Sequence, residues 1–75
     1  MRFFIDYKTK DRSLYDYQGD EFMSSKDAFD FARETAQSLK NGLDGEWKGW
    51  SVEVRDAAGR KYFSFPVGTD RALAA

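Results

Sequence analysis

The sequence predicts an α+β fold, a ββαββ two-layer sandwich with one helix packed on one face of an antiparallel-rich, four-stranded sheet. Residues 50–67 alternate apolar and polar side chains on both sides of a turn, which is typical of a β-hairpin. Residues 25–40 instead carry apolar side chains at helical spacing. Because a hairpin alone is only marginally stable, we expect the helix to cover the apolar face of the sheet.

The first strand is expected at residues 2–9, and a second, shorter strand is expected at residues 14–17. Side chains alternate along the first strand, so Phe3, Ile5 and Tyr7 share one face, which we place toward the helix. A polar turn joins the two strands. The second strand is expected to pair with the first as a hairpin at an edge of the sheet, although the turn between them contains no glycine and is a weaker hairpin signal than the turn of the second hairpin.

Helix signals follow directly. Ser24 is a good N-cap, and Asp27 can complete a short-armed capping box. Asn41-Gly42 is a plausible C-cap, so the helix is expected to run from about residue 25 to residue 40. The apolar stripe expected to face the sheet consists of Ala28, Phe29, Ala32, Ala36 and Leu39.

The second hairpin is expected at residues 50–67, around a turn at residues 56–60 that begins with Asp and contains Gly. Its inward-facing side chains are expected to be Trp50, Val52, Val54, Phe63 and Phe65, and Val67 falls on the same side of the second half as Phe63 and Phe65. Residues 68–75 are expected to be a flexible C-terminal tail. The chain is therefore expected to hold a single domain at residues 1–67.

Composition limits the function classes. The 75 residues include no Cys and no His, which excludes disulfides and the usual zinc sites. Seven Phe, four Tyr and two Trp are more rings than one small core needs, so we expect some of them at the surface or in an interface. The net charge is −1, whereas a typical nucleic-acid binder carries a basic stripe. No apolar run is long enough to span a bilayer, and the lack of Cys fits a cytoplasmic protein.

No catalytic constellation is present in the sequence. There is no His for acid–base chemistry, and the acids fall mostly in turns or on polar faces. Asp6 is expected to form a cross-strand ion pair with Arg55 or Lys8. The acids of residues 16–21 lack the alternate spacing of a calcium loop and indicate turn chemistry. We therefore expect no enzyme activity, no cofactor, no metal and no small-molecule substrate.

The sheet face away from the helix is the candidate interaction surface. By alternation it carries aromatic and cationic side chains, with a tryptophan from the preceding loop at its flank: Phe4, Lys8, Arg55, Tyr62 and Trp47. Such a face can form a protein interface, with a partner or in a homodimer. It can alternatively stack single-stranded nucleic acid, although the balanced charge and the acids Asp6 and Glu53 disfavour this. Scattered exposed rings can also have no function.

The interpretation is therefore a protein-interaction or regulatory module without catalysis, with single-stranded nucleic-acid binding as the alternative. The sheet edges are a second place where a partner can dock, by adding a strand.

Several motifs along nearly the whole chain resemble a known family. They are the opening Arg2-Phe3-Phe4, residues 16–19 followed by Glu21-Phe22, the spaced Ala28, Ala32 and Ala36, and residues 50–56 with Gly59-Arg60. In these the chain resembles short uncharacterised bacterial proteins of rhizobial type, a family classed as a domain of unknown function. It departs from them in its additional aromatics, Tyr15, Tyr17, Phe31 and Trp47. The resemblance implies a small cytoplasmic bacterial protein, and it transfers no activity and no functional residue.

Overall fold

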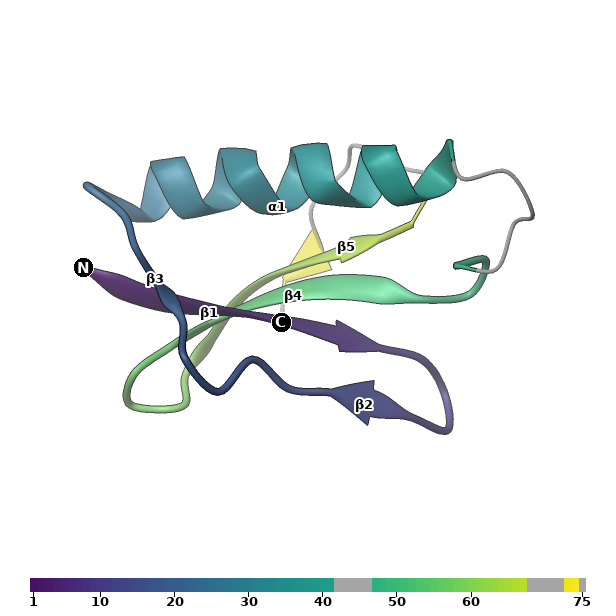
Figure 1. The fold of residues 1–75 in the computed structure, drawn as a ribbon, viewed down its shortest axis with the longest axis horizontal. Coiled ribbons are helices and arrows are strands. Elements are labelled where there is room, and N and C mark those ends of the chain that lie inside the picture. The colour runs from purple at the N-terminus through teal and green to yellow at the C-terminus, as the bar shows by residue number, and fades with distance from the viewer. Residues whose placement is uncertain (42–46, 68–72, 75) are drawn as a thin grey trace.

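One helix and six strands make up the described part of the chain, in a computed structural model that describes residues 1–41, 47–67 and 73–74. In chain order they are β1 (Arg2–Lys8), β2 (Ser13–Leu14), β3 (Asp20–Glu21), α1 (Ser25–Lys40), β4 (Ser51–Asp56), β5 (Lys61–Pro66) and β6 (Leu73–Ala74). The helix lies along one face of the sheet (Figure 1), which confirms the predicted α+β fold. No helix among the described residues is long and apolar enough to cross a membrane.

The sheet is antiparallel throughout and has the order β2-β1-β4-β5-β6, with β3 also paired to β1. The sequence left open which strands join the two halves of the chain. The structure pairs β1 with β4 over six register positions, from Phe3 opposite Asp56 to Lys8 opposite Ser51. The first strand and the second hairpin therefore form one continuous three-stranded centre, and the shorter strands flank it.

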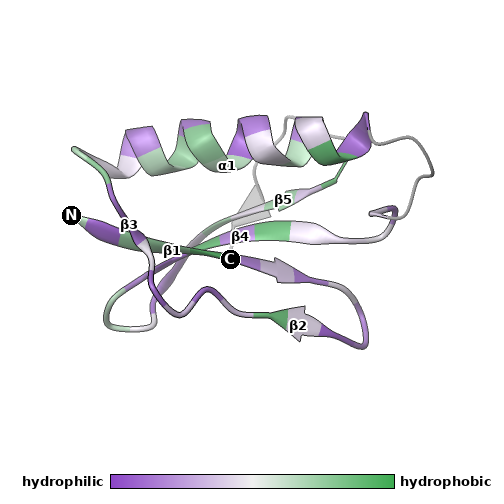
Figure 2. Ribbon diagram, in the orientation of Figure 1, coloured by the Kyte–Doolittle hydropathy of each residue, from purple (hydrophilic) through white to green (hydrophobic). Residues whose placement is uncertain are grey.

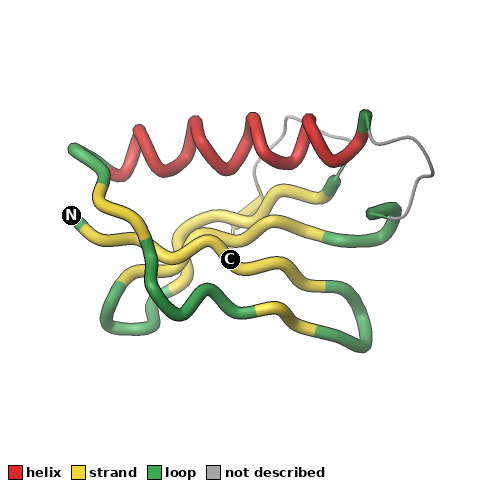
Figure 3. The backbone as a smooth tube through the Cα atoms, viewed as in Figure 1, coloured by secondary structure: helices red, strands yellow, loops and turns green. Residues whose placement is uncertain are grey.

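The predicted second strand at residues 14–17 is wrong in its bounds. The chain instead pairs with β1 twice, through β2 at one end and through β3 at the other. Figure 3 draws a loop between these two short strands. The loop interrupts the strand because a side chain takes the place of a strand partner: the Asp16 carboxylate accepts the backbone N–H of Ile5 at 3.2 Å.

The far edge of the sheet also differs from expectation. Leu73 and Ala74 pair with Ser64 and Phe63 of β5 and form β6. The segment expected to be a flexible tail therefore contains a short strand at these two residues. The other residues of the expected tail, 68–72 and 75, lie outside the described residues.

The helix has the bounds that the sequence predicts. Ser24 has an extended backbone, and its side chain accepts the N–H of Asp27 at 3.3 Å, as an N-cap does. Asn41 closes the other end, where its N–H donates to the carbonyl of Gln37 at 3.3 Å. The second residue of the expected C-cap, Gly42, lies outside the described residues.

The core lies between the helix and the sheet. Its buried hydrophobic residues are Phe3, Ile5, Ala28, Ala32, Ala36, Trp50, Val52, Val54 and Phe65. The three alanines are fully buried, because their small side chains let the helix lie close to β4 and β5. The Phe29 ring fills the space beside them and meets the Phe65 ring edge-on at 5.0 Å. Figure 2 shows hydrophobic residues alternating with hydrophilic ones along the helix and the strands, as a two-layer sandwich requires.

Candidate functional site

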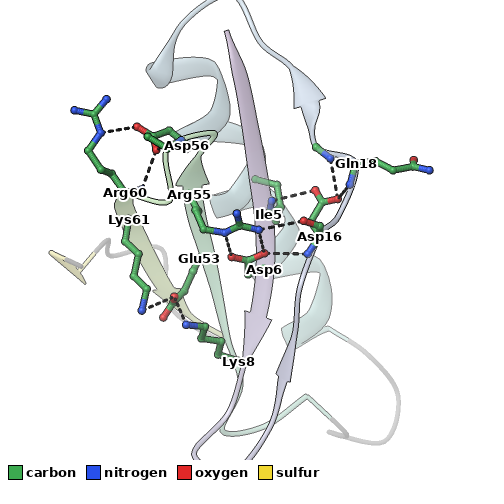
Figure 4. A network of polar contacts seen from close by, with 12 residues as sticks. Ile5, Asp6, Lys8, Asp16, Gln18, Glu53, Arg55, Asp56, Arg60 and Lys61 are labelled. Atoms are coloured by element: carbon green, nitrogen blue, oxygen red, sulfur yellow. Dashed lines mark hydrogen bonds and ion pairs between the residues drawn. The ribbon is translucent and has the colours of Figure 1, made fainter.

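The sheet face away from the helix is organised around one buried carboxylate. Asp6 lies in the middle of β1 and is only 2% exposed. Arg55 from β4 binds it with two donors, Nε at 2.8 Å and Nη2 at 3.2 Å (Figure 4). This confirms the predicted cross-strand ion pair. A fork-shaped contact of this kind fixes the direction of both side chains, in addition to neutralising their charges.

The loop between β2 and β3 closes over this pair. Asp16 donates its backbone N–H to Asp6 at 3.0 Å, and its carbonyl accepts Nη2 of Arg55 at 3.1 Å. The Asp16 carboxylate in turn accepts three backbone N–H groups, from Ile5, Gln18 and Gly19. Burial alone would raise the pKa of Asp16, but these hydrogen bonds and the charge of Arg55 outweigh it and lower the pKa. Asp16 therefore acts as a charged tie that fixes the loop across β1.

The remaining charges of this face pair with one another. Glu53 lies between two lysines, with Oε1 at 3.4 Å from Nζ of Lys8 and at 3.9 Å from Nζ of Lys61. The guanidinium of Arg55 covers the ring of Phe4, at 4.7 Å from its centroid. The face therefore presents a network of paired charges (Figure 4), in which the buried Oε1 of Glu53 has these ion pairs but no hydrogen bond among the described residues. The Phe4 ring of the predicted interaction surface is covered by the Arg55 guanidinium.

Three of the five predicted surface residues, Phe4, Lys8 and Arg55, do share this face. The expected place of Tyr62 is wrong. Its ring packs against Phe3 at 5.4 Å and belongs to the shell around the core. The cause is a register shift between Val54 and Arg55, which leaves Tyr62 as an extra residue on β5 and ends the simple alternation there.

The expected place of Trp47 is also wrong. Its ring lies 5.8 Å from the ring of Tyr7 and 5.1 Å from the ring of Trp50. These two side chains belong to the helix-facing side of the sheet, where Tyr7 packs against the core and Trp50 is buried. Trp47 therefore extends the aromatic packing at the end of the sheet, and it does not flank the opposite face.

A groove on the other side of β1 was not predicted. It has a volume of about 400 Å³ and is lined by Ile5, Tyr7, Leu14, Tyr15, Asp16, Asp20 and Phe31. These residues come from β1, from β2 with the loop after it, from β3 and from α1. We call this feature the edge groove. Leu14, Tyr15 and Phe31 are 50%, 48% and 44% exposed, so three large apolar side chains meet solvent around one cavity.

The surroundings of the edge groove include several acids, together with the cation of Lys8, whose Nζ lies 5.5 Å from the centroid of the Tyr15 ring and is paired with Glu53. Asp20 lines it and is exposed. On the helix, Asp27 and Glu34 are exposed four residues before and three residues after Phe31, which places them on the same helix face. None of these three acids forms an ion pair within residues 1–41, 47–67 and 73–74. Burial, and to a smaller extent the charge of Asp16, raises the pKa of Tyr7 in the groove wall.

One sequence signal could have found the groove. Phe31 is a large apolar residue just outside the stripe that Ala28 and Ala32 define, where a helix of this kind usually carries polar side chains. The other wall could not have been found in this way, because Tyr15 and Asp20 are brought to Phe31 by the loop between β2 and β3, which the alternation pattern does not predict.

Comparison with known protein families assigns the chain to a family. The family described as "Domain of unknown function (DUF6894)" matches residues 2–68, which is nearly the whole chain. No curated protein and no solved structure matches the chain.

Proposed function

The chain belongs to the DUF6894 family of domains of unknown function, and we propose that it acts as a protein-binding module without catalysis, with the edge groove as its binding site. The observation that carries this proposal is the set of three half-exposed apolar side chains, Leu14, Tyr15 and Phe31, around one cavity. We also propose a bacterial origin and a cytoplasmic location. The motifs that resemble bacterial proteins support the first, and the absence of Cys supports the second.

The energetics favour a partner at the groove. Complete burial of a side chain such as Leu or Phe contributes roughly 1.5–3 kcal/mol. Leu14 and Phe31 have realised only about half of their burial within the chain itself, so a partner that covers them gains the rest. Aromatic residues are also enriched at the centres of protein interfaces.

The sheet face away from the helix is a less favourable binding site than the edge groove. Asp6 and Arg55 already bind one another, Glu53 is ion-paired with Lys8 and Lys61, and opening these contacts would cost free energy. Binding of single-stranded nucleic acid to this face also has less support, because the Arg55 guanidinium covers the Phe4 ring on which a base would stack. Acids at the edge groove would also repel phosphates.

Selection from a random peptide library on the immobilised protein tests this proposal. We expect peptides that bind the wild type and lose affinity for Phe31→Ala. Met23→Ala is the matched control, because Met23 is apolar, 92% exposed and outside the groove lining. Circular dichroism and urea unfolding should show that both variants keep the fold. A library that yields no peptide, or only peptides that bind Phe31→Ala as well as the wild type, would refute the groove as a binding site.

A further inference from the structure

We propose that the edge groove binds a positively charged amphipathic segment of another protein, with an apolar side chain in the cavity and Lys or Arg side chains against the acidic surroundings. This inference rests on the proposed function and specifies the chemistry of the partner. Three features of the groove lead to it: its size, its charge and the state of the neighbouring strand edge.

The size of the groove sets what can enter it. A volume of about 400 Å³ corresponds to roughly a dozen water molecules at ~30 Å³ each. That is room for one or two large side chains, and it is too small for a folded element. Ile5 is buried and Tyr7 half-buried in the groove wall, so the inserted group meets an apolar surface. The partner therefore presents an apolar anchor that projects from its own backbone.

The charge of the groove sets what must surround the anchor. The carboxylates of Asp20, Asp27 and Glu34 have no ion-pair partner among the described residues. A Lys or Arg of the partner beside the anchor would form ion pairs with these carboxylates and would increase the association rate. A second copy of this chain fits less well, because a two-fold symmetric contact places the same patch on both sides and would bring these acids together.

The hydrogen bonds at the edge of β1 decide whether the partner's backbone can pair with the sheet. The edge of β1 that borders the groove is paired with β2 at Tyr7 and Lys8 and with β3 at Arg2 and Phe3. Between them the N–H of Ile5 is bound by the Asp16 carboxylate. A strand added at this edge would therefore have to break existing hydrogen bonds. Recognition through side chains, as when an amphipathic helix occupies a groove, requires no such exchange.

Fluorescence anisotropy with designed peptides tests the inference. The probe is a labelled amphipathic peptide of about 18 residues with Leu on one face and Lys on the other, long enough to form a helix. Matched probes carry Glu in place of Lys or Ser in place of Leu. We expect the Leu/Lys probe to bind the wild type and the other two to bind at least about ten-fold more weakly.

Variants of the protein locate the contact. Phe31→Ala should weaken binding of the Leu/Lys probe about ten-fold, as loss of a central aromatic anchor does. The double variant Asp20→Asn/Glu34→Gln should weaken it about three- to ten-fold and reduce its salt dependence. Met23→Ala and Asp11→Asn remove an exposed apolar group and an exposed acid that do not line the groove, and they should leave binding unchanged.

Each other outcome has a defined meaning. Equal, Phe31-dependent binding of the Lys and Glu probes would overturn the charge preference and leave the proposed function standing. Binding that depends on the acids and not on Phe31 would overturn the groove as the site, because it would reflect general charge attraction. Absence of binding by every probe would overturn this inference, while the library selection would still decide the proposed function.

Discussion

Two turns of this protein share one local pattern and do different things. Both begin with Asp and reach a left-handed Gly three residues later: Asp16-Tyr17-Gln18-Gly19, with φ of 72°, and Asp56-Ala57-Ala58-Gly59, with φ of 87°. In both, the Asp carboxylate accepts backbone N–H groups of its own turn, from Gln18 and Gly19 in the first and from Ala58 and Arg60 in the second. Figure 4 shows both turns.

The difference lies in their distant contacts. The bonds that the Asp56 side chain makes all end within the turn, which joins β4 to the neighbouring β5. The Asp16 residue is bound to Ile5 and Asp6 of β1 and to Arg55 of β4. The first kind of turn closes a hairpin. The second kind replaces part of a strand, covers a buried ion pair and carries one wall of the edge groove, so a local pattern alone does not reveal which role a turn has.

The largest expected effect comes from removing the carboxylate that the long-range turn covers. Asp6→Ala leaves Arg55 without its partner and the N–H of Asp16 without its acceptor. Breaking a buried pair in this way costs about 3 kcal/mol of the free energy of unfolding. Urea unfolding at neutral pH measures it. Asp56→Ala should cost less, because its Arg60 partner is largely exposed and its contacts are local. An equal or larger loss in Asp56→Ala would contradict this account of the two turns.

The two glycines give the next comparison. An Ala at either position must hold a left-handed backbone, which costs ~1–2 kcal/mol. At Gly59 a Cβ would meet no atom within 4 Å. At Gly19 it would lie 2.9 Å from the backbone carbonyl oxygen of Phe3 and 3.1 Å from Cγ of Arg2, so the loop would have to move away from β1.

Gly19→Ala should therefore lower the free energy of unfolding by at least about 1 kcal/mol more than Gly59→Ala does. Thermal and urea unfolding of both variants measure the difference. Gly19→Ala should also weaken peptide binding, because the loop carries the groove lining residues Tyr15 and Asp16. Similar stabilities for the two variants would mean that the loop tolerates displacement from the strand.

The same distinction explains which parts of the fold the sequence predicts. The bounds of α1 and the second hairpin follow from signals within a few residues, namely the Ser24 cap, the alanine stripe and the turn around Gly59. The interrupted strand β2/β3 depends on its pairing with β1 and on the Asp16 side chain between the two short strands. The bulge at Tyr62 lies within the hairpin itself, where Val54 pairs with Phe63 and Arg55 pairs with Lys61, and the alternation pattern does not reveal it. Since one shifted register reverses the face of a side chain, local alternation could not place Tyr62.

The candidate site follows the same rule. Alternation correctly placed Phe4, Lys8 and Arg55 on one face, but it could not show that Arg55 covers Phe4 or that Lys8 and Arg55 are already held in ion pairs there. Trp47 was misplaced because a loop residue has no periodicity from which to assign a face. The edge groove was missed because its walls come from separate elements that only the tertiary structure brings together.

The smallest expected effect concerns pH and salt. The pKa of Asp16 is lowered in the folded protein, so the charged carboxylate stabilises the fold above the unfolded pKa of about 3.9, and this contribution is lost as the pH falls through the folded value. Asp16→Asn should therefore cost about 1 kcal/mol at neutral pH, and the gap to the wild type should narrow below about pH 4. Urea unfolding between neutral and acidic pH measures this gap.

Asp56→Asn is the matched variant. Burial would raise the pKa of Asp56, but hydrogen bonds from Arg60 and Ala58 and the charge of Arg60 lower it, so the pH dependence has the same sign. The two variants should differ in how their loss of stability depends on salt concentration. The Arg60 side chain is 74% exposed, so added salt should screen its pair with Asp56 and reduce the effect of Asp56→Asn. Asp16 is held mainly by backbone N–H groups, and the effect of Asp16→Asn should change little with salt. Equal salt sensitivity in the two variants would show that Asp16 acts mainly through the charge of Arg55, and the tie across β1 would then be an ion pair more than a set of hydrogen bonds.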